Sequence, residues 1–184
     1  MRSILFVVLA VLLLVALVGV LLRHYLRARR TADTTWDDLL KRLIWVDRNN
    51  IATIALDMVD ESGELRRDED AFVLEPSAIW SLLGGLKGLE ALEQNTHVLV
   101  ELATYVQKWY PEAVVMAEQL RLNAREIEWH VGRLKGAAQT GNLESAFAGY
   151  AQRAAATYYL MTQHVLALYE AASVPGLAEL QRAL

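Results

Sequence analysis

The stretch AVVMAEQLRLNAREIEWHVGRLKGAA, residues 113–138, decides the fold because its apolar residues recur at alternating steps of four and three. This heptad pattern is typical of a helix that packs along one edge against other helices. The residues on this edge are Ala113, Ala117, Leu120, Ala124, Ile127, Val131, Leu134 and Ala138. Because half of them are alanine, neighbouring backbones can approach closely.

The next segment repeats the pattern, with an edge formed by Phe147, Ala151, Ala154, Tyr158, Met161, Val165, Leu168 and Ala172. Apolar periods, prolines and capping residues indicate four long helices, over residues 35–59, 77–110, 111–141 and 142–173. A charged connection follows the first of them, and a short helix is expected from Gly176. The predicted fold is all-α: an antiparallel four-helix bundle with a short C-terminal helix.

An uncharged apolar run, SILFVVLAVLLLVALVGVLL, occupies residues 3–22 and is long enough to cross a bilayer as one helix. Four basic residues follow it at once: Arg23, Arg27, Arg29 and Arg30. Because basic residues beside a span are retained in the cytoplasm, we expect an outside amino terminus and a cytoplasmic bundle. The sequence thus predicts a single-pass protein of the inner (cytoplasmic) membrane, with residues 3–22 in lipid.

The predicted domains are a transmembrane anchor with its basic juxtamembrane segment, residues 1–30, and a soluble helical bundle, residues 31–184. The four arginines also fit a contact with anionic lipid head groups. A cleaved signal peptide is a weaker reading, because a signal core spans only about 7–15 residues. The opposite orientation is a second alternative, since one arginine, Arg2, precedes the run.

The overall charge and the motif content exclude several classes of function. A formal net charge of −4 argues against a nucleic-acid partner. The chain has no cysteine, which excludes disulfides and thiolate metal sites. It contains no phosphate-binding loop, nucleophile elbow or zincin motif, so we predict no catalytic residue and no cofactor.

The segment EIEWH, residues 126–130, raises the question of a metal site. Ferritin-like bundles place ligands inward with Glu-x-x-His, whereas Glu126 and His130 are four residues apart. The heptad pattern turns Glu126 away from the packed edge and leaves His130 on its flank. Glu93 and His97 repeat this spacing on a solvent-facing side. Both pairs are predicted to be surface contacts within one helix, and no metal is expected.

Two further sets of residues are expected to shape the packing. Gly84 and Gly88 share one face of a predicted helix, where glycine is unfavourable, so a close helix contact is expected and a kink is the alternative. Three polar residues fall on or near apolar faces, namely Asp47, Asn50 and Asn95. We expect buried, hydrogen-bonded groups that fix helix register; the alternative is a polar site within the bundle.

Apolar residues also appear on the outer side of two helices. Val115, Leu122 and Trp129 recur at intervals of seven opposite the packed edge, and Tyr159 and Leu166 lie off the edge of the last long helix. Aligned apolar residues of this kind suggest a covered surface. The five residues are predicted to dock a protein partner or a second copy. The alternative is that the anchor or the C-terminal tail covers them.

The sequence therefore predicts a non-enzymatic membrane protein that serves as an accessory or scaffolding subunit of a larger, for example energy-converting, membrane complex. A membrane-anchored signalling or sensor bundle is the second hypothesis. A ferritin-like metal-binding bundle is the third, and the spacing of its ligands speaks against it.

Overall fold

The computed structural model describes residues 14–15, 18–19, 35–58 and 74–184. The chain divides into two units, residues 1–35 and residues 36–184. Within the first unit the four described residues are helical, and Leu14, Val15 and Val18 are exposed. Most of the apolar run 3–22 and all four arginines that follow it lie outside the described residues. No helix among the described residues combines the length and the apolar character needed to cross a bilayer.

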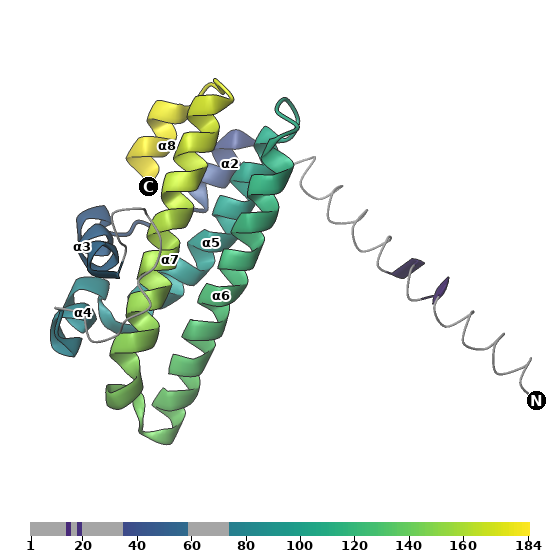
Figure 1. Cartoon of the computed structure of the whole chain (residues 1–184). Coiled ribbons are helices and arrows are strands. Elements are labelled where there is room, and N and C mark those ends of the chain that lie inside the picture. The colour runs from purple at the N-terminus through teal and green to yellow at the C-terminus, as the bar shows by residue number, and fades with distance from the viewer. Residues whose placement is uncertain (1–13, 16–17, 20–34, 59–73) are drawn as a thin grey trace, which may run out of the picture. The chain divides into compact units, whose positions relative to one another are not determined.

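The described part of the second unit is built from helices and turns, which confirms the all-α class for these residues (Figure 1). Its helices are α2 (Trp36–Lys41), α3 (Arg48–Met58), α4 (Pro76–Leu83), α5 (Gly85–Val106), α6 (Ala113–Thr140), α7 (Leu143–Ala171) and α8 (Leu177–Ala183). The helices α5, α6 and α7 pack against one another, and α7 also packs against α3, α4 and α8. The unit is a helical bundle.

The hairpin of α6 and α7 follows the predicted pattern closely. Gly141 ends α6 with a φ of 76°, a left-handed conformation that glycine adopts without strain. The α6 edge is buried from Ala113 to Leu134, and the α7 edge from Phe147 to Leu168. The heptad interpretation is therefore confirmed for both helices over these residues. Only Ala138, in the last turn of α6, is exposed.

The predicted helix over residues 35–59 is wrong, because α2 ends at Lys41 and α3 begins at Arg48. The Asp47 side chain starts α3 by accepting hydrogen bonds from the backbone N–H groups of Asn49 (2.9 Å) and Asn50 (3.2 Å). The chain between the two helices is held by Asn95 of α5. Its side-chain oxygen accepts from the Ile44 N–H at 2.8 Å, and its nitrogen donates to the Ile44 carbonyl at 2.8 Å.

The three predicted polar residues thus have separate roles. Asn95 is buried and also donates to the Tyr158 hydroxyl of α7 at 3.2 Å. Half-buried Asn50 donates to the carbonyl of Leu82 at 3.1 Å, which ties α3 to α4. Asp47 caps a helix. Asn95 and Asn50 therefore fix how separate segments meet, whereas Asp47 acts within its own segment.

The predicted helix over residues 77–110 is also wrong as one element, because it breaks between α4 and α5. Gly84 and Gly85 have φ values of 71° and 68°, which turn the chain sharply. A Cβ atom on Gly84 would meet nothing within 4 Å, so this glycine serves the turn rather than the helix contact expected of it. Gly88 does make a close approach, since a Cβ there would lie 1.6 Å from the Leu83 carbonyl oxygen.

Aromatic packing joins α2 to α5 and α7. The Trp36 ring lies 5.3 Å from that of Tyr169 in α7 and 6.0 Å from that of Tyr105 in α5. Gly176 lies against the same indole with a φ of 101°, directly before α8. The short C-terminal helix expected after Gly176 is therefore present as α8.

Candidate functional site: the outer face of α6

The far side of α6 carries three exposed apolar residues at intervals of seven. Val115, Leu122 and Trp129 are 76%, 57% and 56% exposed, although α6 is packed along its other edge. We call these three residues the outer stripe. Among the described elements α6 packs mainly against α5 and α7, and the C-terminal α8 packs on α7. The described residues therefore leave the outer stripe uncovered.

Charged and polar residues flank the stripe in the same seven-residue rhythm. On the α5 side stand Glu118 and Arg125, and on the α7 side stand Glu112, Gln119, Glu126 and Arg133. The sides follow from contacts: Glu118 pairs with Arg121, which donates to Thr104 of α5 at 3.2 Å. Residues seven apart stay on one side of a helix, which places Arg125 with Glu118.

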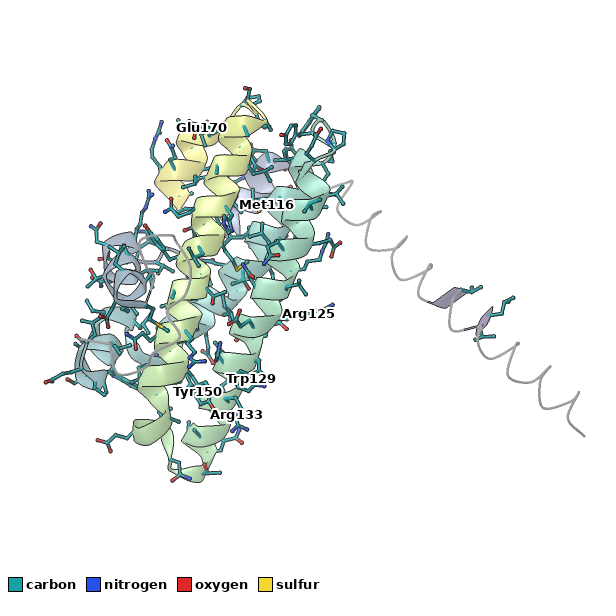
Figure 2. The ribbon with its side chains drawn as sticks, in the orientation of Figure 1. Met116, Arg125, Trp129, Arg133, Tyr150 and Glu170 are labelled. Atoms are coloured by element: carbon teal, nitrogen blue, oxygen red, sulfur yellow. The ribbon has the colours of Figure 1, made fainter. Side chains whose placement is uncertain are left out.

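Trp129 is held in place although it is exposed. Its ring lies 5.5 Å from the Tyr150 ring of α7 and 5.0 Å from the His130 ring, in edge-to-face arrangements. The Arg133 guanidinium lies 5.9 Å from the Trp129 ring and 6.0 Å from the Tyr150 ring. Figure 2 shows Trp129 and Arg133 beside Tyr150 near the hairpin end of α6 and α7. The indole is therefore a pre-ordered projection that leans toward α7.

A groove lies at the other end of the stripe, between the first turns of α6 and the last turns of α7. Its volume is about 570 Å³, and apolar atoms make up most of its lining. The lining residues are Tyr110, Glu112, Val115, Met116, Gln119, His164, Ala167, Leu168 and Ala171. Because Ala167 and Ala171 have small side chains, α7 leaves room beside α6. Val115 belongs both to the groove and to the outer stripe.

The groove wall also carries a polar atom that lacks a partner. The Nδ1 atom of His164 is buried and has no hydrogen bond. His130 Nδ1, near the other end of the stripe, has the same property. A buried polar atom without a partner carries a desolvation cost. The groove is therefore mostly apolar, and one of its lining residues, His164, has a buried nitrogen without a hydrogen bond.

The two predicted histidine contacts differ from expectation. Glu126 Oε1 lies 3.6 Å from His130 Nε2 within α6, but His130 is only 4% exposed rather than at the surface. His97 lies 3.5 Å from Glu128 of α6, and Glu93 accepts from Lys135 at 2.9 Å. The Glu93–His97 prediction was wrong because both side chains pair across the α5–α6 interface. In the part of the chain that the structure describes, no three acidic or histidine side chains converge as a metal site would require.

The structure separates the five predicted docking residues into two groups. Val115, Leu122 and Trp129 share the exposed face of α6. Tyr159 is half-buried and packs beside Ala55 and Met58 of α3, which cover it. Leu166 is half-buried, packs against the main core, and lies seven residues beyond Tyr159 on the same side of α7. The proposed surface therefore excludes Tyr159 and Leu166.

Sequence reasoning missed Arg133, Tyr150 and the α7 half of the groove. The Trp129–Arg133 spacing of four residues was a usable signal, since such residues are neighbours on a helix. Tyr150 and His164 gave no such signal, because their relevance depends on which turns of α7 face α6. Comparison with known protein families, with curated proteins and with solved structures found no match to this chain.

Proposed function

We propose that this chain is a non-enzymatic membrane protein whose helical bundle docks a protein partner through the outer face of α6. The observation that carries the proposal is the outer stripe, with its ordered Trp129 at one end and an apolar groove at the other. Trp, Tyr and Arg are the residue types that dominate binding energy at protein interfaces, and they meet here in Trp129, Tyr150 and Arg133. Their mutual contacts lower the ordering cost of association.

In this proposal residues 3–22 anchor the chain as a single transmembrane helix, with Arg23, Arg27, Arg29 and Arg30 on the cytoplasmic side. The protein belongs to the inner membrane, with its amino terminus outside and its bundle in the cytoplasm. In the proposed four-helix arrangement α5, α6 and α7 are three of the helices, and α3 and α4 together take the place of the fourth. Its role is that of an accessory or scaffolding subunit of a larger membrane assembly.

The test compares the full chain with Trp129→Glu after purification in mild detergent. Trp129→Glu places a charge within the contact and should abolish co-purification of the partner, while the helical circular dichroism stays unchanged. Trp45→Glu is the matched control, because Trp45 is 79% exposed and lies on the connection between α2 and α3, away from α6. Equal retention of the partner by both variants would refute docking through this face.

A sensor bundle is the second candidate function, and the groove is the observation that favours it. Its volume suits a small ligand, and His164 is among its lining residues. A sensor should release a small molecule when the purified protein is denatured, as judged by mass spectrometry. His164→Phe should lose that molecule, whereas Trp129→Glu should retain it.

A further inference from the structure

The two ends of the α6 face have complementary shapes. Trp129 projects seven residues beyond Leu122, and Val115, which borders the groove, lies seven residues before it. At 1.5 Å per residue each feature lies about 10 Å from Leu122 along the helix. Both features lie toward α7, because Trp129 contacts Tyr150 and the groove is walled by α7. The Trp129 side chain and the groove therefore lie at equal distances from Leu122 along α6, and both lie on the side of α6 that faces α7.

A two-fold axis perpendicular to α6 at Leu122 would use this arrangement. Such an axis runs two copies of α6 antiparallel and keeps the α7 sides of both copies together. Leu122 then faces Leu122 of the second copy, and each Trp129 faces the other copy's Val115. The indole of each copy reaches the groove of the other, so one contact is made twice, as in an isologous dimer.

The flanking charges obey the same symmetry. On the α5 side the axis brings Glu118 of one copy to Arg125 of the other. On the α7 side it brings Glu112 to Arg133 and Gln119 to Glu126. Each of the first two pairs joins opposite charges, and the third joins an amide donor to a carboxylate. Glu112, Glu118 and Arg125 are exposed and thus accessible to a second molecule.

We infer that the partner docked by the outer face of α6 is a second copy of this chain, bound antiparallel about Leu122 with each Trp129 seated in the other copy's groove. This inference rests on the proposed docking function and names its partner. The face supplies both halves of its own complement in shape and in charge, which a surface for an unrelated protein has no need to do. A parallel pair would set Trp129 against Trp129 and leave both grooves empty.

The first test uses single cysteines, because the natural chain has none. In membranes containing the full chain, Leu122→Cys should form a disulfide-linked dimer under mild oxidation, since the two positions face each other across the axis. Val115→Cys should form no disulfide-linked dimer, because its two copies would lie about 21 Å apart along the helix, beyond disulfide reach. Glu170→Cys, at an exposed position on α7, is the control that reports random collision.

Each outcome of this test is decisive. Cross-linking at Leu122→Cys alone supports the antiparallel contact. Cross-linking at both Val115→Cys and Leu122→Cys would show a parallel pair and overturn the inference. No cross-linking above the Glu170→Cys level would also overturn it. The co-purification test separates this failure from failure of the proposed function. If no cross-link forms but Trp129→Glu loses a different co-purifying protein, docking through α6 stands and only the identity of the partner is wrong.

The second test exchanges charges. Glu118→Arg places two arginines together at each of the two equivalent contacts, and Arg125→Glu places two glutamates together. Each variant alone should dimerise about tenfold or more weakly than the natural chain in sedimentation experiments in detergent. An equal mixture of the two variants should recover the dimer, because both contacts are then of opposite charge. A mixture no stronger than its components would overturn the inference, provided circular dichroism shows both variants folded.

Discussion

At the scale of single residues, Asn95 shows what sequence can and cannot specify. A polar residue among the apolar positions of a helix predicts a buried, hydrogen-bonded group, and Asn95 is one. Its partner could not be predicted, because it is the backbone of Ile44, in a segment whose apolar period favoured a helix. The side-chain amide takes the place that a neighbouring strand would occupy, by satisfying both the N–H and the carbonyl.

Asn95→Ala should therefore lower the free energy of unfolding by about 2–4 kcal/mol, because it leaves two backbone groups of Ile44 without partners. Denaturant titration followed by circular dichroism measures the change. Asn123→Ala is the control, since Asn123 accepts an exposed hydrogen bond from Gln119, and it should cost less than about 1 kcal/mol. Similar losses in the two variants would contradict the assigned role.

Tyr158 predicts how stability depends on alkaline pH. Burial raises the pKa of Tyr158 to about 12, although the hydrogen bond from Asn95 acts in the opposite direction. In the unfolded chain tyrosine ionises near pH 10, so between about pH 10 and 12 the unfolded state binds fewer protons than the native state. The contribution of protonated Tyr158 to the free energy of unfolding is therefore fully present below about pH 10 and is lost as pH rises toward 12.

In that window the natural chain should lose about 1.4 kcal/mol of unfolding free energy per pH unit more than Tyr158→Phe does. Urea titrations at several pH values from 9 to 12 measure the two slopes. Parallel slopes would show that the Tyr158 hydroxyl is not shielded from solvent.

At the scale of elements, sequence predicted the continuous helices and missed the breaks. The edges of α6 and α7 were correct because their heptad period runs uninterrupted over many turns. Residues 35–59 and 77–110 also keep an apolar period, but α2–α3 and α4–α5 change direction within them. The signals for these breaks were present in Asp47, a capping residue, and in the Gly84–Gly85 pair. Periodicity outweighed them because apolar residues recur whether or not the axis bends.

The candidate site divides in the same way. The outer stripe could be predicted, because it lies on one helix and needs only the seven-residue spacing. The groove could not, because it exists between α6 and α7 and depends on where small residues of α7 fall opposite Met116. The same limit explains the misplacement of Tyr159, which α3 covers.

Alanine substitutions should distinguish a glycine that is required by a close contact from a glycine in a helix with open space around it. Gly88→Ala should lower the free energy of unfolding by about 1–3 kcal/mol, because its Cβ would collide with the carbonyl of Leu83. Gly132→Ala, within α6, should raise it by about 0.5–1 kcal/mol, because a Cβ there meets nothing within 4 Å and alanine favours helix. Thermal and urea unfolding measure both changes. The same sign for both variants would refute the close approach at Gly88.

At the scale of the whole molecule, the described elements of the bundle are arranged around α7. This helix packs directly against α6, α5, α3, α4 and α8, and α5 also packs against α6 (Figure 1). Tyr159 and Leu166, which were predicted to be part of a docking surface, are therefore used by α7 for internal packing. The apolar stripe of α6 has no such use within the described bundle, which is the physical basis for the proposed partner.

If that partner is a second copy, stability must depend on protein concentration. The thermal midpoint of the natural chain should rise by about 1–3 °C for each tenfold increase in concentration at a fixed detergent level. Trp129→Glu should have a midpoint that does not change with concentration. Differential scanning calorimetry over a hundredfold range measures both trends, and a constant midpoint for the natural chain would contradict self-association.

The central place of α7 has a consequence for how the chain is made. A ribosome delivers residues in order, and α7, at Leu143–Ala171, emerges after nearly everything that packs on it. The apolar edges of α3, α4, α5 and α6 must therefore wait in the nascent chain until the late helix arrives. The core of the bundle is therefore completed only once α7 has been synthesised, because α3, α4, α5 and α6 all pack against it.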